Sequence, residues 1–176
     1  MQTRRVAAQV TIDSPVGDLV VSSTPVGIAG VQFAGDTKLE LRVDESTFTQ
    51  GDRAVAIQLI VSASSQLGEY FAGQRRAFDL VYDLVGTEFQ LQAWKALARI
   101  PFGETVSYKQ QAIWVARPTA TRAVGAANGR NPVAIVLPCH RVVGANGSLT
   151  GFGGGIERKE WLLRHERGQN ENGSHY

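Results

Sequence analysis

The sequence contains a single cysteine, Cys139, and this scarcity excludes an internal disulfide bond. No spacing of cysteine and histidine supplies the ligands of a zinc site, so we expect no metal and no cofactor. No apolar run approaches the roughly 18 residues that a membrane-spanning helix needs. The N-terminus also lacks the apolar core of a signal peptide. These absences predict a chain that resides in the reducing cytoplasm and does not enter a membrane.

The 176 residues have a small net charge of +2, but the charge is unevenly distributed. Residues 85–168 hold eleven Lys or Arg against five Asp or Glu, a net of +6. Residues 1–84 hold seven against ten, a net of −3. A basic half joined to an acidic half suggests that one of them meets a polyanion such as nucleic acid. An ordinary solvated surface gives the same counts, so charge alone does not decide.

The first half predicts a small antiparallel sheet with one helix. Short apolar runs are separated by Ser14-Pro15-Val16-Gly17 and Thr24-Pro25-Val26-Gly27, which are typical turn sequences. Later, apolar positions recur at helical spacing. In chain order we expect a three-stranded antiparallel meander over residues 6–35, a polar loop over 36–52, a helix over 53–71 ending near Gly73, and a strand or extended linker over 77–84.

The second half predicts mostly helices, which makes the chain an α+β protein. Thr87, Ser107 and Thr119 are good N-caps. Two short helices joined by the turn Ala116-Arg117-Pro118 predict a helix-turn-helix unit, a motif that either binds DNA or is only architecture. We expect helices after Thr87 and over residues 107–115, 119–127 and 157–166, followed by a disordered tail over 169–176.

A glycine-rich stretch surrounds Cys139. The apolar run Val133–Leu137 predicts a buried strand, and Pro138 ends its hydrogen bonding so that the thiol faces a cavity. A lone cysteine is most often a small buried side chain without chemistry. The adjacent His140 and Arg141 instead favour a thiol whose pKa is lowered towards the nucleophilic thiolate. Local chemistry leaves both interpretations open.

Two short motifs around this cysteine are distinctive. They are Asn131-Pro132 and Pro138-Cys139-His140-Arg141-Val142-Val143-Gly144. Related motifs lie on both sides of them, namely Phe89-Gln90, Trp94, residues 100–105, Ser107-Tyr108, Arg122-Ala123-Val124-Gly125, Leu149-Thr150-Gly151-Phe152 and residues 159–163. Together they resemble the signature of the O6-alkylguanine-DNA alkyltransferases, which repair DNA by direct reversal. The match is dense over residues 86–166, whereas the first 85 residues match only in general pattern.

The resemblance implies a domain plan and a reaction. Residues 1–84 would form a ribonuclease-H-like scaffold domain, and residues 85–168 a DNA-binding alkyltransferase domain. The thiolate of Cys139 would attack the alkyl carbon on O6 of guanine. Because the alkyl group stays on sulfur, one turnover would consume the protein. O4-alkylthymine is a second candidate substrate.

Further residues match positions that assist this chemistry in the family. His140 matches the residue that activates the thiol through a water molecule, and Glu166 the carboxylate behind it. From the residues alone, Glu166 is either the best acidic candidate to orient the imidazole, because its helix could pack back against the strand, or a surface residue at a helix end. Tyr108 matches the tyrosine that protonates the departing guanine. Asn131 matches the asparagine that braces the turn carrying the site. The substrate pocket would be formed by Val142, Phe152, Gly153 and Gly154.

The resemblance also implies how double-stranded DNA is bound. A base inside a duplex cannot reach a buried thiol, so the target nucleotide must be flipped out. Arg122 matches the arginine that fills the vacated stack, while its helix lies in the minor groove, which suits small side chains. No obligate protein partner is implied. The expected DNA-contacting residues are Arg122, Tyr108, Ala123, Gly125, Ala126, Ala127 and Arg130.

Three residues depart from the family pattern. Gln111 stands where a buried Leu or Ile is usual, and Ala116 where a turn glycine is common, so both put the packing of the helix pair in question. Gly153 stands where some relatives have a serine hydroxyl aimed at O6, which leaves only its backbone N–H for that role.

Two other functions compete with alkyl transfer. A cysteine hydrolase with a Cys-His-carboxylate triad would turn over repeatedly, but it gives the arginine-bearing helix pair no task. A DNA-lesion binder without chemistry would flip alkylated bases for other repair factors. Relatives of that kind lack the cysteine, so Cys139 favours chemistry.

Overall fold

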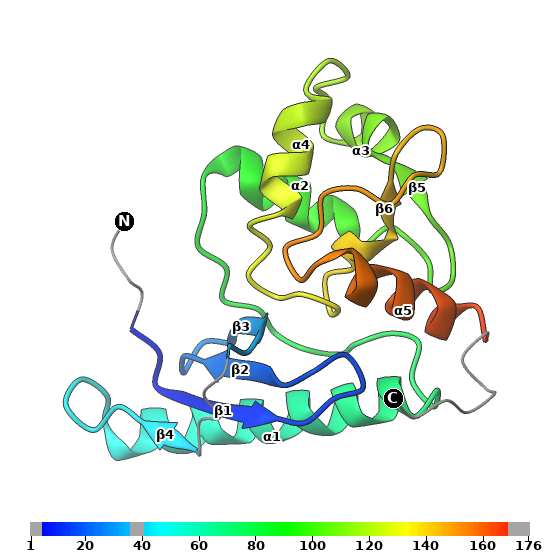
Figure 1. Cartoon of the computed structure of the whole chain (residues 1–176). Helices are drawn as coiled ribbons and strands as arrows, with labels where there is room; N and C mark the ends of the chain where they lie inside the picture. The colour runs from blue at the N-terminus through cyan, green and yellow to red at the C-terminus, as the bar shows by residue number, and fades with distance from the viewer. Residues whose placement is uncertain (1–4, 36–40, 169–176) are drawn as a thin grey trace. The chain divides into compact units, whose positions relative to one another are not determined.

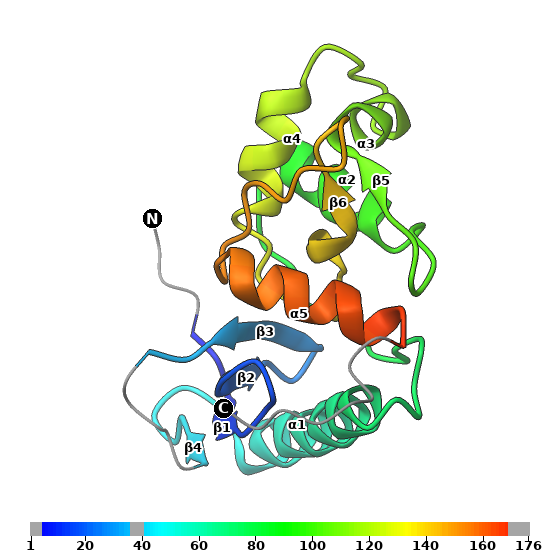
Figure 2. The same ribbon diagram turned by 45° about the vertical axis from the view of Figure 1, so that its right-hand side comes forward.

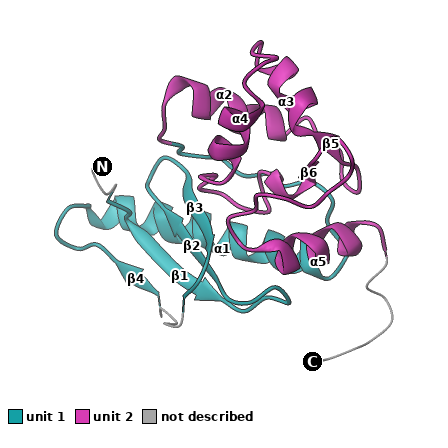
Figure 3. Cartoon of the chain, turned by 45° about the horizontal axis from the view of Figure 1, so that its top comes forward, with its two compact units in different colours: residues 1–84 teal, residues 85–176 magenta. Residues whose placement is uncertain are grey.

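The computed structural model describes residues 5–35 and 41–168, so the expected tail over 169–176 lies outside it. The chain divides into two compact units, residues 1–84 and 85–176 (Figure 3). An antiparallel sheet in the first and mainly helices in the second confirm the predicted α+β class. Among the described residues, no helix is both long enough and apolar enough to cross a bilayer.

The first unit packs one long helix against a four-stranded sheet (Figures 1 and 2). The sheet order is β3-β2-β1-β4 and all neighbours are antiparallel, which confirms the meander and adds one short strand inside the stretch predicted as a loop. Residues 36–40 of that loop lie outside the described chain. The elements are β1 (Ala8–Ile12), β2 (Leu19–Ser23), β3 (Ile28–Phe33), β4 (Arg42–Val43) and α1 (Gln50–Phe71).

Helix α1 begins earlier than the predicted residue 53 because of its cap. The Thr49 side chain accepts a hydrogen bond from the Asp52 N–H, and the Asp52 carboxylate accepts one from the Thr49 N–H. This reciprocal capping box satisfies two otherwise free backbone donors. On the sheet side, the buried Ser23 hydroxyl donates to the Ala56 carbonyl at 2.8 Å and ties β2 to the helix.

The segment over residues 77–84 is extended, as expected, and lies beside β3. The Ile28 N–H donates to the Val81 carbonyl at 2.8 Å, and the Asp83 N–H donates to the Ile28 carbonyl at 2.9 Å. A Cβ at Gly27 would lie 2.8 Å from the Val81 carbonyl oxygen. Only glycine therefore allows this close approach of the two backbones.

Among its described residues, the second unit contains four α-helices, one short 3-10 helix and one pair of very short strands (Figures 1 and 2). Thr87 and Ser107 cap their helices through side-chain hydrogen bonds, as predicted. The predicted Thr119 cap is wrong, because the helix begins at Thr121 after Ala120 and has no side-chain cap. The elements are α2 (Glu88–Leu97), β5 (Val106–Ser107), α3 (Tyr108–Trp114), α4 (Thr121–Asn128), β6 (Val142–Val143) and α5 (Ile156–Glu166).

The strand predicted over Val133–Leu137 is also wrong. Residues 134–136 form turns and Leu137 lies in a bend, and Ile135 has a φ of 72°, a left-handed conformation that a strand excludes. The run is apolar because its side chains are buried, and its one bridge residue, Val133, does not make it a strand. The chain then enters a short 3-10 helix, Cys139–Arg141, and β6 pairs in parallel with β5, which brings the start of α3 beside the cysteine.

Two buried amides join the helices of the helix-turn-helix unit. Gln111 on α3 donates to the Asn128 side-chain oxygen at 3.0 Å, and Asn128 on α4 donates back to Gln111 at 2.7 Å. Gln111 also donates to the Ala93 carbonyl on α2 at 3.0 Å. The departure at Gln111 thus leaves no packing defect, because its amide is hydrogen-bonded to both neighbouring helices.

This amide pair predicts a specific pattern of stabilities. Gln111→Leu should lower the free energy of unfolding by about 1–3 kcal/mol, because it strands the buried Asn128 amide without a partner. The double variant Gln111→Leu/Asn128→Leu should recover part of that loss, since both polar groups are then removed. Urea unfolding of the single and double variants measures the coupling. If the losses of unfolding free energy from the two single substitutions simply added in the double variant, the two amides would not be coupled.

Candidate active site

Asn131 shapes the turn that carries the cysteine. Its side-chain amide donates to the Leu137 carbonyl at 2.7 Å and to the Cys139 sulfur at 3.2 Å. Its oxygen accepts a hydrogen bond from the Val133 N–H at 3.0 Å. One side chain therefore closes the turn at both ends and also holds the sulfur in place.

The Cys139 thiol is buried, with 6% of the residue exposed. Burial raises the pKa of Cys139, against the opposing effects of the Asn131 hydrogen bond and the Lys159 charge. The expectation of a lowered pKa is therefore wrong. Arg141 gives no help, because its guanidinium binds Glu166 and the Ile100 carbonyl. A protonated thiol at neutral pH needs a base when it reacts.

His140, Glu166 and Arg141 form a buried cluster that can supply this base. His140 Nε2 lies 2.7 Å from Glu166 Oε1. Arg141 donates two hydrogen bonds to the same carboxylate, from Nε to Oε2 at 2.8 Å and from Nη2 to Oε1 at 3.0 Å. The Gly103 N–H donates to Glu166 Oε2 at 3.0 Å. Glu166 is thus no surface helix end.

The electrostatics of the cluster fix the state of the imidazole. Burial alone raises the pKa of Glu166, but the hydrogen bonds from His140 and Arg141 and the charge of Arg141 hold that pKa well below its usual value. Burial lowers the pKa of His140, outweighing the attraction of Glu166. A neutral His140 beside a carboxylate carries its proton on Nε2. Its buried Nδ1 makes no hydrogen bond within the described chain, so that lone pair is free to accept a proton.

A buried lysine joins the cysteine turn to the following loop. Lys159 Nζ donates to the Val142 carbonyl at 2.6 Å and to the Thr150 carbonyl at 2.8 Å, and it lies 5.7 Å from the centre of the Tyr108 ring. Burial lowers the pKa of Lys159 to about 8. The Tyr108 hydroxyl donates to the same Thr150 carbonyl at 2.7 Å, and burial raises the pKa of Tyr108, so the phenol keeps its proton.

Comparison with known proteins identifies the family. The model described as "6-O-methylguanine DNA methyltransferase, DNA binding domain" matches residues 88–168, and the model of the same name for the "ribonuclease-like domain" matches residues 9–84. This chain belongs to the 6-O-methylguanine DNA methyltransferase family.

Individual members of the family agree over nearly the whole chain. A Mycolicibacterium paratuberculosis protein named methylated-DNA--protein-cysteine methyltransferase is 46% identical over 157 residues, covering 89% of this chain and 90% of that protein. A Methanosarcina barkeri protein of the same name is 41% identical, covering 88% and 94%. The crystal structure of Mycobacterium tuberculosis OGT in complex with DNA superposes with a TM-score of 0.75 at 43% identity, covering 90% of this chain and 92% of that one.

The helix α4 that the family resemblance assigns to DNA presents a mainly small, exposed face. On α4, Arg122, Ala123 and Ala126 are exposed and Gly125 is half-buried, and Arg130, two residues beyond the end of the helix, is exposed as well. Ala127 does not fit this assignment, because its side chain is buried against the core, while its carbonyl accepts a hydrogen bond from the Trp94 indole. The two long cations, Arg122 and Arg130, thus lie at an exposed surface whose other residues are small.

The loop expected to cover the substrate meets the end of that helix. Phe152 and Gly154 are half-buried and Gly153 is exposed, whereas Val142 is buried with its carbonyl already bound by Lys159. A Cβ at Gly153 would lie 3.2 Å from the Gly129 carbonyl oxygen. The serine that some members of the family carry there would thus need a small shift of the backbone just after α4.

The sequence did not predict the roles of two residues of this site, Arg141 and Lys159. It shows Arg141 only as a neighbour of the thiol and Lys159 only within a matching motif, but the structure buries both and gives each two or more hydrogen bonds. Arg141 offered a signal as a cation beside an apolar run, whereas Lys159 lies among charged residues and offered none. Within the described residues, no cluster of three or more His, Cys, Asp or Glu could hold a metal ion.

Proposed function

We propose that this chain repairs DNA by moving the alkyl group from O6 of an alkylated guanine to the sulfur of Cys139, once per molecule. The observation that carries the proposal is the buried arrangement of a thiol, a neutral imidazole with a free Nδ1, and a carboxylate held by Arg141. Membership of the family and the DNA complex of a relative support DNA as the partner.

The groups present suffice for a balanced transfer. The thiol proton of Cys139 passes to His140 Nδ1, directly or through one water molecule, while Glu166 stabilises the imidazolium that results. The thiolate attacks the alkyl carbon, a new S–C bond forms, and the bond between that carbon and O6 breaks. Tyr108, which keeps its proton because its pKa is raised, donates it to the departing guanine. The thioether is stable, so no second turnover follows.

We infer that the lesion reaches the thiol by base flipping from the minor groove. The thiol is almost fully buried, whereas Arg122 projects from the exposed face of α4 among small residues. Such a face suits the narrow groove, and the arginine can fill the space of the flipped base. Phosphate contacts from the basic unit would make binding salt-dependent.

Intact-protein mass spectrometry tests the reaction. Wild-type protein incubated with a duplex containing one O6-methylguanine should gain a single methyl group, with a limit of one per molecule. Cys139→Ala should gain none, because it lacks the acceptor sulfur. An unmodified wild-type protein that still binds the lesion tightly would show that the lesion-binding function is correct instead. Repeated release of methylated product would favour a hydrolytic enzyme.

Arg122 gives a separate test of base flipping. Arg122→Ala should slow repair of a duplex by about tenfold or more, since unstacking a base costs a few kcal/mol that the arginine offsets. Transfer from free O6-benzylguanine should stay nearly unchanged, because that substrate needs no flipping. Single-turnover rates with both substrates measure the difference. Equal losses would reject the flipping role.

A further inference from the structure

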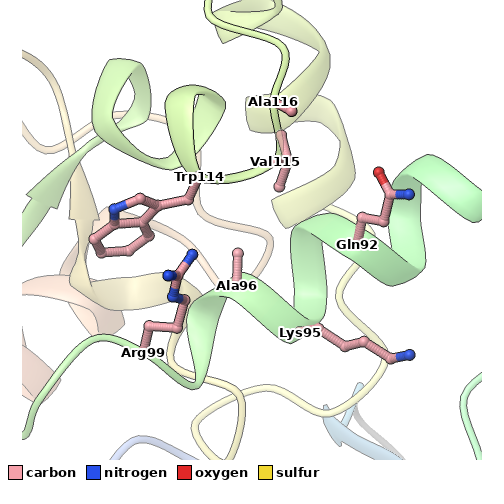
Figure 4. A pocket seen from close by; sticks show the side chains of 7 residues that line it. All are labelled: Gln92, Lys95, Ala96, Arg99, Trp114, Val115 and Ala116. Atoms are coloured by element: carbon pink, nitrogen blue, oxygen red, sulfur yellow. The ribbon is translucent and has the colours of Figure 1, made fainter.

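A second concave site lies in the same unit, between α2 and the end of α3 (Figure 4). Its volume is about 420 Å³, within the usual range of small-molecule sites. The reaction proposed above uses none of its lining residues, which are Gln92, Lys95, Ala96, Arg99, Trp114, Val115 and Ala116.

The lining combines cations with an aromatic face. Lys95 lies on α2 and Arg99 lies in the turn just after that helix, four residues further along the chain, and both are exposed. The Arg99 guanidinium carbon lies 5.2 Å from the centre of the Trp114 ring, so charge and ring share one edge of the pocket (Figure 4). No lining residue is acidic. The nearby carboxylate of Glu88 accepts a hydrogen bond from Gln92 at 3.3 Å.

This combination selects a ligand with both a flat ring and a negative charge. Carboxylates and phosphates pair with adjacent Lys and Arg, while a base stacks on a tryptophan or on a guanidinium plane. Proteins that bind single-stranded nucleic acid use the same two elements, a basic track and a stacking ring. A base inside a duplex offers no free face, so the ring of Trp114 is useful only to an unpaired nucleotide.

We propose that this pocket binds one unpaired nucleotide of a DNA strand, with its base against Trp114 and its phosphate on Lys95 and Arg99. The site goes beyond the proposed repair reaction, which uses α4 and the cysteine cluster. It gives the protein a second hold on DNA at a gap, end or melted stretch. It rests on the proposed function only in taking DNA as the partner.

The alternative ligand is the phosphate backbone of an intact duplex, bound by the same two cations. Only an unpaired nucleotide would also need the ring of Trp114, so substitutions of Trp114 distinguish the two ligands. Fluorescence anisotropy of a labelled octathymidylate measures binding to the full chain. Trp114→Leu should weaken binding about tenfold, the scale of one lost stacked base, and Trp114→Phe should restore most of it. Lys95→Gln/Arg99→Gln should weaken binding at least as much. The matched control is Lys109→Gln/Arg117→Gln, which removes two exposed cations of the same unit that do not line the pocket.

The outcomes distinguish this proposal from the repair reaction. Unchanged binding by Trp114→Leu, or an equal loss in the control pair, would mean phosphate attraction without a nucleotide site and would overturn the proposal. Methyl transfer to Cys139 is measured in the same preparations, at saturating duplex. If transfer proceeds in every variant while octathymidylate does not bind even the wild type, the nucleotide site is wrong and the proposed function stands.

Discussion

Glu166→Gln is expected to lower both the stability of the protein and the rate of alkyl transfer. The carboxylate accepts hydrogen bonds from His140, from Arg141 and from the Gly103 N–H, and its side chain is fully buried. A neutral amide leaves the buried guanidinium of Arg141 without its counter-charge. Breaking a buried pair in this way costs about 3–5 kcal/mol.

The rate should fall independently of the stability. The carboxylate keeps the proton of His140 on Nε2, which leaves Nδ1 without a proton and able to act as the base. Glutamine can hydrogen-bond the imidazole in either orientation and cannot stabilise the imidazolium. Loss of a positioned general base costs about 10²–10⁴ in rate. Single-turnover transfer from an O6-methylguanine duplex, measured where urea unfolding shows the variant to be folded, gives this effect.

Glu160→Gln is the matched control on the same helix. Glu160 also pairs with an arginine, Arg164, at 3.0 Å, but both side chains are about half exposed. Exposed pairs contribute about 0–1 kcal/mol, so this variant should keep nearly full stability and rate. If the two variants behaved alike, the buried cluster would have no special role in the reaction.

The sequence predicted the elements whose signals are local. The turns that bound the first strands are found in the structure, and the hydroxyls of Thr87 and Ser107 cap their helices as predicted. The strand over Val133–Leu137 failed because an apolar run reports burial and not backbone geometry. The turns there depend on the Asn131 side chain reaching two backbone groups.

The residues of the site were easier to predict from the sequence than the pKa of the thiol. The cationic residue beside Cys139 in sequence suggested a lowered thiol pKa, but Arg141 turns away towards Glu166. This pairing depends on the tertiary structure, because Glu166 lies on α5, 25 residues further along the chain. Burial then dominates the thiol and raises its pKa. Neighbouring residues in the sequence could indicate a reactive cysteine, but they could not show that Arg141 binds Glu166 instead of the thiol.

Lys159→Met is expected to slow alkyl transfer by about tenfold at neutral pH, because the thiol loses a nearby charge that favours the thiolate. The Lys159 charge opposes the rise in pKa that burial imposes on Cys139, so its removal raises the thiol pKa further. The change in stability should be smaller. Methionine removes one donor from the Val142 carbonyl, whereas the Thr150 carbonyl keeps the Tyr108 hydroxyl as a donor. The substitution also removes the cost of keeping an ammonium away from water.

The dependence on pH separates charge from structure. The pKa of Lys159 is lowered to about 8, so the wild-type lysine is charged below that pH and neutral above it. If the charge assists the thiol, wild type should transfer faster than Lys159→Met below pH 8, and the ratio of their rates should shrink above it. A neutral amine still donates hydrogen bonds to the Val142 and Thr150 carbonyls. A constant ratio from pH 6.5 to 9.5 would therefore mean that Lys159 only holds the loop in place.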